Sequence, residues 1–463
     1  MITLDEKDSR PLYFQIYSQI KTQIHEGRLK AGDRLSSKRK LSESLGVSVN
    51  TVETAYSQLL SEGFIEARPK RGYFVCQIDE LNLGKRDRKT AASEKITKAG
   101  PEIKIDFSTE GVDYENFPYN TWVKLMKNCF NEYNPKILRS SPPEGDWEMR
   151  KAVAAHIYRS RGVNCGAESV IIGAGVDNLL NVISGLLGKE YMIAMENPVY
   201  SEAYAIFRYL GHRLCSIPVD YAGIMADKLP DREKTAVYVT PSHQFPLGIT
   251  MPAGRRVKLL NWACDGKDRY IIEDDYDSEF RYNSKPIPAV QSIDVNGRVI
   301  YLGTFSKTIA PAIRIGYMVL PDSLMEIYNQ RFNKFSSAVS MMEQNILTAF
   351  INEGHYERHL NRMRKLYGEK RTVLLRELGN IRGIRINGEN AGHHLALKLE
   401  DGLDEEDMVR LAGLKGVKVY PISQYFTSEV PDKFKSTVLM GYAQLSEGKI
   451  IEGVRLLRSA WNI

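Results

Sequence analysis

From about residue 104 onward, short apolar runs alternate with stretches that are long enough to form helices. The runs are bounded by turn residues and read SVIIGAG, EYMIAMENP, TAVYVTPS, RYIIEDDY and RVIYLGTFSK. Strands that are buried on both faces have this continuous β-branched character, and helices between them connect parallel neighbours. The alternation therefore predicts an α/β domain over residues 104–463, in which helices cover both faces of a mostly parallel sheet.

The last third of the chain predicts a smaller subdomain, mainly from about residue 325 to 463. A long helical stretch with apolar stripes comes first, and the β-like runs HHLALKL, GVKVYP and STVLMGYA follow it. His394 lies in the first of these runs. It either faces a ligand or is an ordinary core or surface histidine, and the sequence favours the second interpretation.

Four of the predicted strands end in residues with binding or reactive chemistry, and such groups collect at the carboxyl ends of strands in open α/β sheets. Residues 174–177 open a helix whose free amides suit a phosphate. The Pro-rich turn TPSHQFPLG holds His243 and Gln244. The run IIEDDYDSEF ends a buried strand in acids, which is costly unless a cation is nearby. The run GTFSK ends in Lys307, an amine that can capture a carbonyl cofactor as a Schiff base.

The order of these features resembles the fold type I aminotransferases, which hold pyridoxal 5'-phosphate, and the resemblance covers about residues 105–463. It implies that Lys307 is the Schiff-base lysine and that Asp274 pairs with the protonated pyridine nitrogen. Asp275 remains an alternative partner, because the sequence alone does not show which of two adjacent acids faces the cofactor. The other cofactor-binding residues that the resemblance implies are Tyr276 on the ring hydroxyl, Thr304, Arg314, Val176 and Asp177 around the phosphate, and Tyr200 and His243 near the ring.

The first 77 residues predict a separate, mainly helical module. Residues 12–26 carry a leucine and three isoleucines at steps of four, which form one stripe of an amphipathic helix. Ser36 or Ser37 can cap a second short helix, and Ser48 can cap a third after a tight Gly-Val-Ser turn. Two short helices joined in this way follow the helix-turn-helix plan, and the alternating run FIEARPKRGYFV predicts a two-stranded wing behind them.

Basic residues gather in this front module. Residues 28–40 hold six of them against Asp33 alone, although the whole chain has a net charge of only +6. A basic patch on a small domain is typical of nucleic-acid binding. The stretch GDRLSSKRKLSESLGVSVNTVETAYSQLLSEGFI, with RGYFV after it, resembles the winged helix-turn-helix of the GntR family of bacterial transcription regulators. The DNA-facing residues that this resemblance implies are Lys38, Arg39, Ser48, Asn50, Thr51, Arg71 and Gly72.

Two positions depart from the GntR pattern. The family often has proline where Ser36 stands and arginine where Val49 stands, so one DNA contact of the family is missing here. A helical module that docks another protein is the alternative interpretation of the same segment.

A GntR-type front followed by an aminotransferase-like body is the arrangement of the MocR/GabR subfamily of regulators. Residues 78–103 are polar and predict a flexible linker between the two parts. The resemblance implies a pyridoxal phosphate-dependent transcription regulator, a homodimer with exchanged domains, that senses an amine, an amino acid or pyridoxal phosphate itself. An active aminotransferase with a DNA-binding head is the main alternative, and a regulator with no cofactor is a third.

The effector cannot be identified from the sequence, but one kind is disfavoured. Members of the subfamily that sense γ-aminobutyrate carry two arginines where this chain has Glu202 and, by our alignment, Leu439. Without that pair a carboxylate has no evident bidentate clamp. We therefore expect that the chain is not a γ-aminobutyrate sensor of the usual kind, and Glu202 favours a cationic amine as one alternative.

Other classes of protein are disfavoured by composition. No apolar run reaches the length of about 18 residues that a membrane span needs, and the start of the chain has no apolar core of a secretory signal. The five cysteines are scattered without paired spacing, which argues against disulfides and against a zinc site. We expect a cytoplasmic protein with no structural metal.

Overall fold

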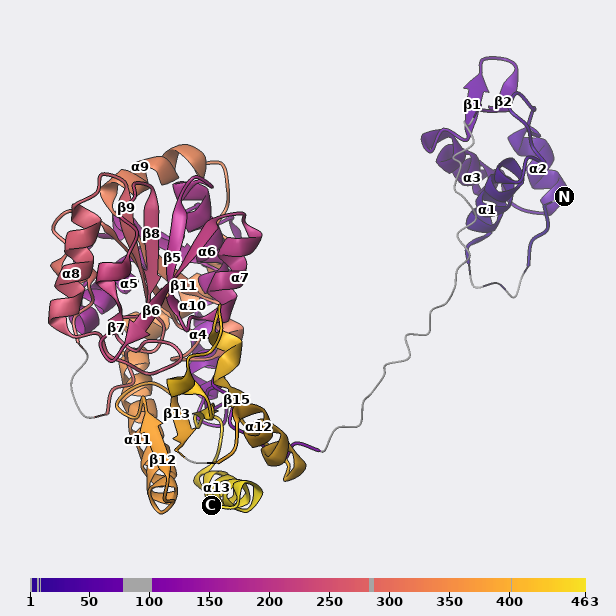
Figure 1. The fold of residues 1–463 in the computed structure, drawn as a ribbon. Helices are drawn as coiled ribbons and strands as arrows, with labels where there is room; N and C mark the ends of the chain where they lie inside the picture. The colour runs from indigo at the N-terminus through magenta and orange to yellow at the C-terminus, as the bar shows by residue number, and fades with distance from the viewer. Residues whose placement is uncertain (1, 6–7, 9, 78–101, 283–286, 401) are drawn as a thin grey trace. The chain divides into compact units, whose positions relative to one another are not determined.

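The computed structural model divides the chain into two compact units, Met1–Thr97 and Lys98–Ile463 (Figure 1). The structure describes residues 2–5, 8, 10–77, 102–282, 287–400 and 402–463. The expected linker over residues 78–103 lies outside the described residues, apart from its last two. Within the described part, no helix combines the length and the apolar character that crossing a membrane requires.

The front unit consists of three helices followed by a hairpin. Its elements are α1 (Leu12–His25), α2 (Lys38–Leu45), α3 (Val49–Ser61), β1 (Ile65–Arg68) and β2 (Gly72–Val75). The Ser37 hydroxyl accepts a hydrogen bond from the amide of Lys40, and the Ser48 hydroxyl accepts one from the amide of Thr51. Because these caps satisfy amides that have no partner inside the helix, α2 and α3 begin where the sequence predicts, and the cap of α2 is Ser37.

The core of the front unit lies between α1 and α3. Ile16, Ile20, Val52, Tyr56 and Leu59 are buried in one apolar cluster. Leu12, the first residue of α1, is 42% exposed, so the buried stripe begins one turn later than the sequence predicts. In the hairpin, Arg68 pairs with Gly72, which leaves Lys70 and Arg71 in the connecting turn.

The second unit is built on an eight-stranded sheet in the order β4-β11-β10-β9-β8-β5-β6-β7. Its strands are β4 (Val170–Gly173), β5 (Met192–Asn197), β6 (Arg213–Asp220), β7 (Gly223–Ile224), β8 (Thr235–Val239), β9 (Arg269–Asp275), β10 (Val299–Thr304) and β11 (Gly316–Val319). Neighbours from β10 to β6 are parallel, while β11 is antiparallel to both β10 and β4 and β7 is antiparallel to β6. The predicted mostly parallel sheet is therefore confirmed.

Helices cover both faces of this sheet, as the sequence predicts. The first α-helices of this unit are α4 (Tyr119–Cys129), α5 (Trp147–Arg161), α6 (Val176–Leu187), α7 (Ser201–Tyr209), α8 (Ala253–Cys264), α9 (Asp322–Arg331) and α10 (Met341–Asn352). Residues of α6, α7 and α9 pack on one face, and residues of α8 pack on the other. Ile193 and Ala194, which are adjacent in β5, belong to these two different clusters because side chains alternate along a strand.

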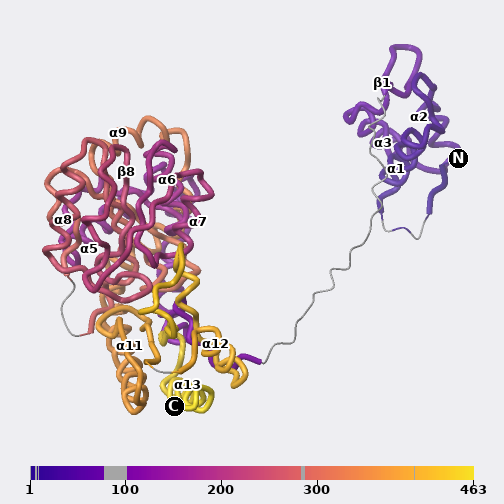
Figure 2. The backbone as a smooth tube through the Cα atoms, viewed as in Figure 1, coloured from indigo at the N-terminus to yellow at the C-terminus, as the bar shows by residue number. Residues whose placement is uncertain are grey.

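A smaller sheet follows, with the order β12-β13-β16-β15. The remaining elements are β3 (Ile105–Asp106), α11 (His355–Gly379), β12 (Ile384–Asn387), β13 (His394–Leu399), α12 (Glu405–Leu414), β14 (Val417–Lys418), β15 (Tyr420–Pro421), β16 (Thr437–Gly441) and α13 (Glu447–Trp461). The labels of α11, α12 and α13 lie at the end of the unit opposite α9 (Figure 2). β3 pairs with β14, so the first described residues of this unit join its carboxyl-terminal part, a contact that the sequence did not predict.

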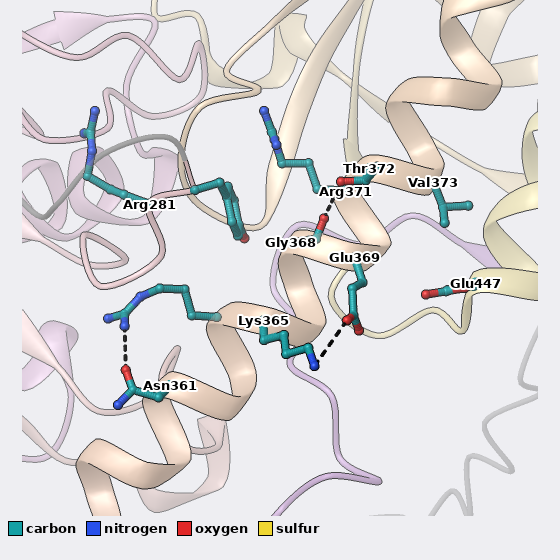
Figure 3. Close-up of a pocket in the computed structure, with 11 residues that line it drawn as sticks. Arg281, Asn361, Lys365, Gly368, Glu369, Arg371, Thr372, Val373 and Glu447 are labelled. Carbon is teal, nitrogen blue, oxygen red and sulfur yellow. Dashed lines mark hydrogen bonds and ion pairs between the residues drawn. The ribbon is translucent and has the colours of Figure 1, made fainter.

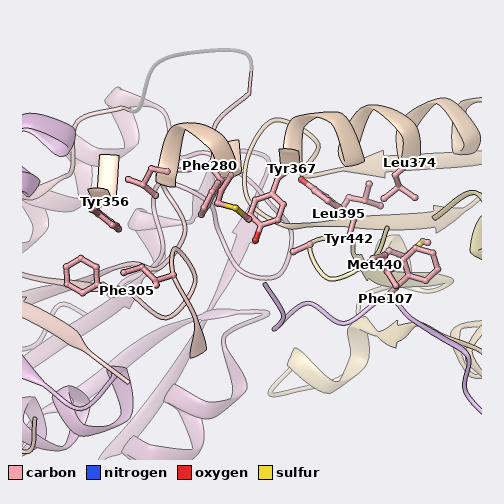
Figure 4. Close-up of a cluster of buried hydrophobic side chains, with 14 of the residues drawn as sticks. Phe107, Phe280, Phe305, Tyr356, Tyr367, Leu374, Leu395, Met440 and Tyr442 are labelled. Carbon is pink, nitrogen blue, oxygen red and sulfur yellow. The ribbon is translucent and has the colours of Figure 1, made fainter. Parts of the chain in front are cut away.

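One large apolar cluster joins the two sheets of this unit. Figure 4 shows part of it, with the labelled rings of Phe280 and Tyr367, whose centroids lie 5.2 Å apart. Phe107 from the start of the unit and Met440 from β16 are buried in the same cluster. The large sheet, whose strand ends hold the predicted binding residues, and the smaller sheet therefore share one continuous apolar core.

Candidate functional site

A pocket of about 350 Å³ lies at the carboxyl ends of the strands of the large sheet. Eight of the nine cofactor-binding residues that the resemblance implies line it: Val176, Asp177, Tyr200, Asp274, Tyr276, Thr304, Lys307 and Arg314. The ninth, His243, does not line the pocket but lies behind Tyr276, whose hydroxyl oxygen is 3.0 Å from His243 Nδ1. Residues that are spread from position 176 to position 314 of the sequence therefore converge on one hollow.

Lys307 lies in the loop directly after β10, where its side chain is half-buried. Its Nζ donates a hydrogen bond to the carbonyl oxygen of Thr109 at 3.2 Å. Burial lowers the pKa of Lys307, while the nearby carboxylates of Asp277, Glu110 and Glu202 act in the opposite direction. A lysine whose pKa is lowered by burial is a better nucleophile toward a carbonyl group than an ordinary surface lysine.

The two adjacent acids at the end of β9 point to opposite sides of the sheet. The hydroxyl of Tyr238 donates a hydrogen bond to Asp274 Oδ2, and both residues line the pocket. Asp275 instead forms a buried ion pair with Arg161, with Nε and Oδ2 2.6 Å apart. The alternation of a strand separates the two carboxylates, so Asp274 is the one that faces the pocket.

Burial raises the pKa of Asp274 to about 7, although the hydrogen bond from Tyr238 works against the rise. A buried carboxylate with a raised pKa has no cation close enough to compensate for its lost hydration. A cationic group brought into the pocket would supply that compensation.

The opposite end of the pocket has the features of an anion site. Gly175 precedes α6 with a φ of 84°, and a Cβ placed on it would lie 3.0 Å from the guanidinium of Arg314. The Arg314 side chain therefore extends over the amino terminus of α6, where the first amides have no partner inside the helix. Arg314 Nη2 also lies 2.8 Å from Asp177 Oδ2. A phosphate group suits this combination of helix amides and a guanidinium.

Tyr276 and the histidines form a network beside the pocket. His243 Nδ1 lies 2.9 Å from Asp277 Oδ2, and the Tyr276 hydroxyl also donates to the His243 carbonyl oxygen at 3.0 Å. His243, Asp277 and His394 can each offer a ligand atom within 4.8 Å of the others, which is the one such group among the described residues. Because His243 and Asp277 bind each other and His394 Nε2 lies 3.1 Å from the Pro246 oxygen, we interpret the group as a hydrogen-bond network.

Several residues that line the pocket were not expected from the sequence: Thr109, Glu110, Tyr238, Thr240, Phe245, Asp277, Ser306, Pro311, His393 and Tyr425. Tyr238 gives no signal because every residue of β8 is buried and the strand shows no alternation. Asp277 could have been found, since it follows Tyr276 directly in a run of buried acids. His394 lines the pocket too, which is the interpretation that the sequence disfavoured.

A larger hollow of about 780 Å³ lies along α11 and has different chemistry (Figure 3). It is lined by the cations Arg281, Arg364, Lys365 and Arg371. Arg364 Nε donates to the carbonyl oxygen of Glu279 at 3.0 Å, and the Arg371 guanidinium lies over the ring of Tyr282. None of the reactive strand ends reaches this hollow, so we assign the functional site to the smaller pocket.

In the front unit, the residues implied in DNA contact lie on α2, on α3 and in the hairpin. Arg39, Asn50 and Arg71 are exposed, whereas Lys38 forms an ion pair with Glu53 of α3. Ser48 and Thr51 bind each other at the start of α3, with their hydroxyl oxygens 2.9 Å apart, and Gly72 begins β2. Of the implied set, the structure thus presents two exposed basic side chains, Arg39 and Arg71, and the residues at the amino-terminal end of α3.

Each unit matches one known family. The family described as "Aminotransferase class I and II" matches residues 102–438, and "Bacterial regulatory proteins, gntR family" matches residues 12–75. The "Uncharacterized HTH-type transcriptional regulator YdeL" of Bacillus subtilis (strain 168) is 40% identical over 457 residues, 98% of this chain and 97% of that protein. The "Probable rhizopine catabolism regulatory protein MocR" of Rhizobium meliloti is 32% identical over 479 residues, 100% of this chain and 96% of that protein.

The chain belongs to the MocR/GabR subfamily of GntR-type regulators. Among solved structures, the multiple substrate aminotransferase from Thermococcus profundus matches this MocR/GabR-type chain with a TM-score of 0.69 and 28% identity, over 78% of this chain and 91% of that one. The winged helix-turn-helix and the fold type I aminotransferase-like unit predicted from the sequence are both confirmed.

The residues of the pocket fit pyridoxal 5'-phosphate, the cofactor of the aminotransferase-like unit. A primary amine, a buried carboxylate without a cation and an anion site occupy three parts of one hollow, through Lys307, Asp274 and Arg314. These are complementary to an aldehyde, a protonated ring nitrogen and a phosphate, in that order. No other described pocket brings these three kinds of group together.

Proposed function

We propose that this MocR/GabR-type chain is a transcription regulator of the cytoplasm that binds operator DNA through residues 1–77 and senses an amine, an amino acid or pyridoxal phosphate through residues 104–463. Residues 78–103 serve as the linker between the two parts. The observation that carries the proposal is the convergence of Lys307, Asp274 and Arg314 on one pocket in a chain that also has a winged helix-turn-helix.

Each part of the pocket has a role in holding the cofactor. Arg314, Thr304 and the amides of Val176 and Asp177 would bind the phosphate, and Asp274 would pair with the ring nitrogen. Tyr276, held by His243, would donate to the ring hydroxyl, and Tyr200 would lie beside the ring. When bound to Lys307, the cofactor supplies an electrophilic carbon to which an incoming amine can be transferred.

Sensing requires that the effector bind two arrangements of the protein with different affinity, because a ligand that binds both equally shifts nothing. An amine that took the place of Lys307 on the cofactor would leave the Lys307 side chain free. Lys307 Nζ lies 3.2 Å from the carbonyl oxygen of Thr109, in the segment after β3, and β3 pairs with β14 in a two-stranded sheet of their own. Release of Lys307 would therefore act on a contact between the large sheet and the segment that follows the β3–β14 pair, and this contact is the element that we propose the effector moves.

The DNA-binding role can be tested with Arg39 and Arg71, the two exposed arginines among the residues implied in DNA contact. We expect the double substitution Arg39→Ala and Arg71→Ala to weaken binding to the protein's own promoter DNA and to lower the slope of log affinity against log salt by about 2 for each protomer bound, about 1 for each lost phosphate contact. Fluorescence anisotropy over a range of salt concentrations measures both quantities. Arg455→Ala on α13 is the control, and an unchanged slope in the double variant would contradict the proposed contacts.

A homodimer with exchanged domains is part of the proposal. On α4 and at the residue that ends it, Tyr119, Val123, Met126 and Phe130 are exposed by 59%, 45%, 41% and 54% and follow the spacing of one helix face. An exposed apolar stripe of this kind is typical of a protein interface. We propose that a second copy of the chain covers it.

For the dimer, we expect the double substitution Met126→Glu and Phe130→Glu to convert the protein to monomers, because carboxylates would be buried without partners in the interface. Size-exclusion chromatography with light scattering measures the mass. Val257→Glu, which places the same charge on a 46% exposed valine of α8, is the control. A wild-type protein that is monomeric, or a double variant that remains dimeric, would refute this interface.

A further inference from the structure

Two glutamates lie at the rim of the cofactor pocket. Glu110 follows β3, Glu202 lies in the first turn of α7, and both are exposed residues that line the pocket. Both carboxylates interact with Lys307 and with Tyr425. Together with Asp277 they oppose the fall in the pKa of Lys307 that burial causes. Burial is the main cause that raises the pKa of Tyr425 to about 12, and the charges of Glu202 and Glu110 add to it. The rim next to the reactive lysine is therefore acidic from two sides.

Lys307 is the cation of the described lining on which these glutamates act, and outside the lining Lys418 lies near enough for Glu110 to contribute to its raised pKa, after Tyr420 and Asp106. Lys307 and Arg314 are the lysine and arginine side chains that line the pocket, and Arg314 is paired with Asp177 at the phosphate end. Burial lowers the pKa of His393, and lowers that of His394 to about 3, so both rings are neutral near pH 7. A carboxylate on an effector would thus meet two carboxylates and no free guanidinium.

Leu439 stands where γ-aminobutyrate sensors of the subfamily are expected to have their second arginine, and its surroundings in the structure are apolar. Leu439 in β16 is fully buried, in one cluster with Ala396, Ile422 and Tyr425. Tyr425 of this cluster lines the pocket, so the wall behind it is apolar and offers no charge to a ligand. A ligand carboxylate would have to lose its hydration here without compensation.

Buried polar atoms without partners give a second, independent indication of a ligand. Asp277 and His393 line the pocket and are 2% and 3% exposed, yet Asp277 Oδ1 and His393 Nε2 have no hydrogen-bond partner. The Asp277 oxygen can only accept while it is ionised, so the missing group on that side is a donor. Buried polar atoms are rarely left unpaired when the protein performs its function.

We propose that the effector is an amine with a second cationic group, of the diamine class, whose distal ammonium binds between Glu110 and Glu202. The inference rests on the proposed function, because the first amine must reach the cofactor on Lys307. Each glutamate then gains a charge-assisted hydrogen bond that an uncharged or anionic tail cannot make.

Three amines of the same chain length separate the contributions of charge and length. They are 1,4-diaminobutane, butylamine and 4-aminobutanoate, whose tails are cationic, neutral and anionic. Isothermal titration calorimetry with the cofactor-loaded full chain gives their affinities, and the visible absorbance of the cofactor and anisotropy of promoter DNA report the response. We expect 1,4-diaminobutane to bind at least ~10-fold more tightly than butylamine, and 4-aminobutanoate to bind more weakly than both.

Glu202→Gln and Glu110→Gln test the site itself. In each variant we expect the preference for 1,4-diaminobutane over butylamine to fall by about 10-fold, while Glu326→Gln on α9 keeps it. The ranking of the three amines on wild-type protein stands as a test even if one variant fails to fold. The proposal is overturned if 4-aminobutanoate binds as tightly as 1,4-diaminobutane, if no probe binds, or if both glutamine variants keep the wild-type preference.

The proposed function and the diamine site would be contradicted by different results. A full chain that binds no cofactor and no promoter DNA contradicts the proposed function. A chain that binds both and yet prefers the anionic or neutral amine contradicts only the diamine site.

Discussion

Replacement of Lys307 by alanine is expected to abolish the visible absorbance band of the cofactor-loaded protein. Lys307 is the one lysine among the described residues that line the pocket, so no neighbouring amine there can replace it. The measurement is the absorbance spectrum of wild type and Lys307→Ala, each purified and then incubated with excess pyridoxal phosphate. Effector-dependent changes in DNA binding should disappear together with the band, since an amine can no longer displace the lysine.

Loss of the band must be separated from loss of the fold. Because burial lowers the pKa of Lys307, its folded-state pKa lies below that of the unfolded chain, and its charged form opposes folding at neutral pH. We therefore expect cofactor-free Lys307→Ala to melt at the same temperature as cofactor-free wild type, or higher. Lys365→Ala on α11 is the matched control and should keep the band. A band that persists in Lys307→Ala would show that the cofactor is held elsewhere or not covalently.

The sequence predicted those parts of the site whose signals are local. The Lys307 and Arg314 positions follow one strand within a short motif, and the anion site needs only a glycine turn and the start of a helix. In the front unit, Ser37 and Ser48 act as helix caps close to where the sequence placed them. In each case the chemistry depends on residues that are near neighbours in the chain, so no tertiary contact has to be known.

The remaining features depend on tertiary contacts. Glu110 reaches the rim because β3, a strand of two residues, pairs with β14 near the other end of the unit. A strand so short has no periodicity to detect. His394 looked like an ordinary histidine in an apolar run, and only the pairing of β13 with β16 and its contact with Pro246 bring it to the pocket. Tyr238 lies in a strand that is buried throughout, where the sequence cannot show which side chains face a ligand.

The sequence also did not show which of Asp274 and Asp275, the adjacent acids at the end of β9, faces the pocket. The structure separates them, so substitution of each acid by asparagine is expected to have the opposite effect on stability and on cofactor binding. We expect Asp275→Asn to lower the free energy of unfolding of the cofactor-free protein by about 3–5 kcal/mol, because it leaves the buried guanidinium of Arg161 without its carboxylate. Asp275 also accepts a hydrogen bond from the hydroxyl of Tyr301 at 2.5 Å, so the loss reaches a second buried group. Urea denaturation at pH 8 measures the change.

Asp274→Asn should behave in the opposite way. The pKa of Asp274 is raised from 3.8 to about 7 in the folded protein, so the stability it contributes is fully present below pH 3.8 and is lost as the pH rises through 7. At pH 8 the ionised carboxylate opposes folding of the cofactor-free protein, and an uncharged asparagine should leave its stability unchanged or raise it. The cost appears in the cofactor instead: without the carboxylate the protonated ring nitrogen has no partner, and we expect affinity for pyridoxal phosphate to fall by at least ~10-fold.

Both variants are compared with Asp227→Asn, an exposed aspartate outside the pocket, by urea denaturation and by titration with the cofactor. If Asp275→Asn loses cofactor affinity while keeping its stability, and Asp274→Asn does the reverse, the two carboxylates have exchanged roles and the assignment is wrong. The expected result would instead show how one strand divides two identical side chains between its two faces. Asp275 then contributes to the stability of the fold through Arg161, and Asp274 is left without a cation so that the cofactor can supply one.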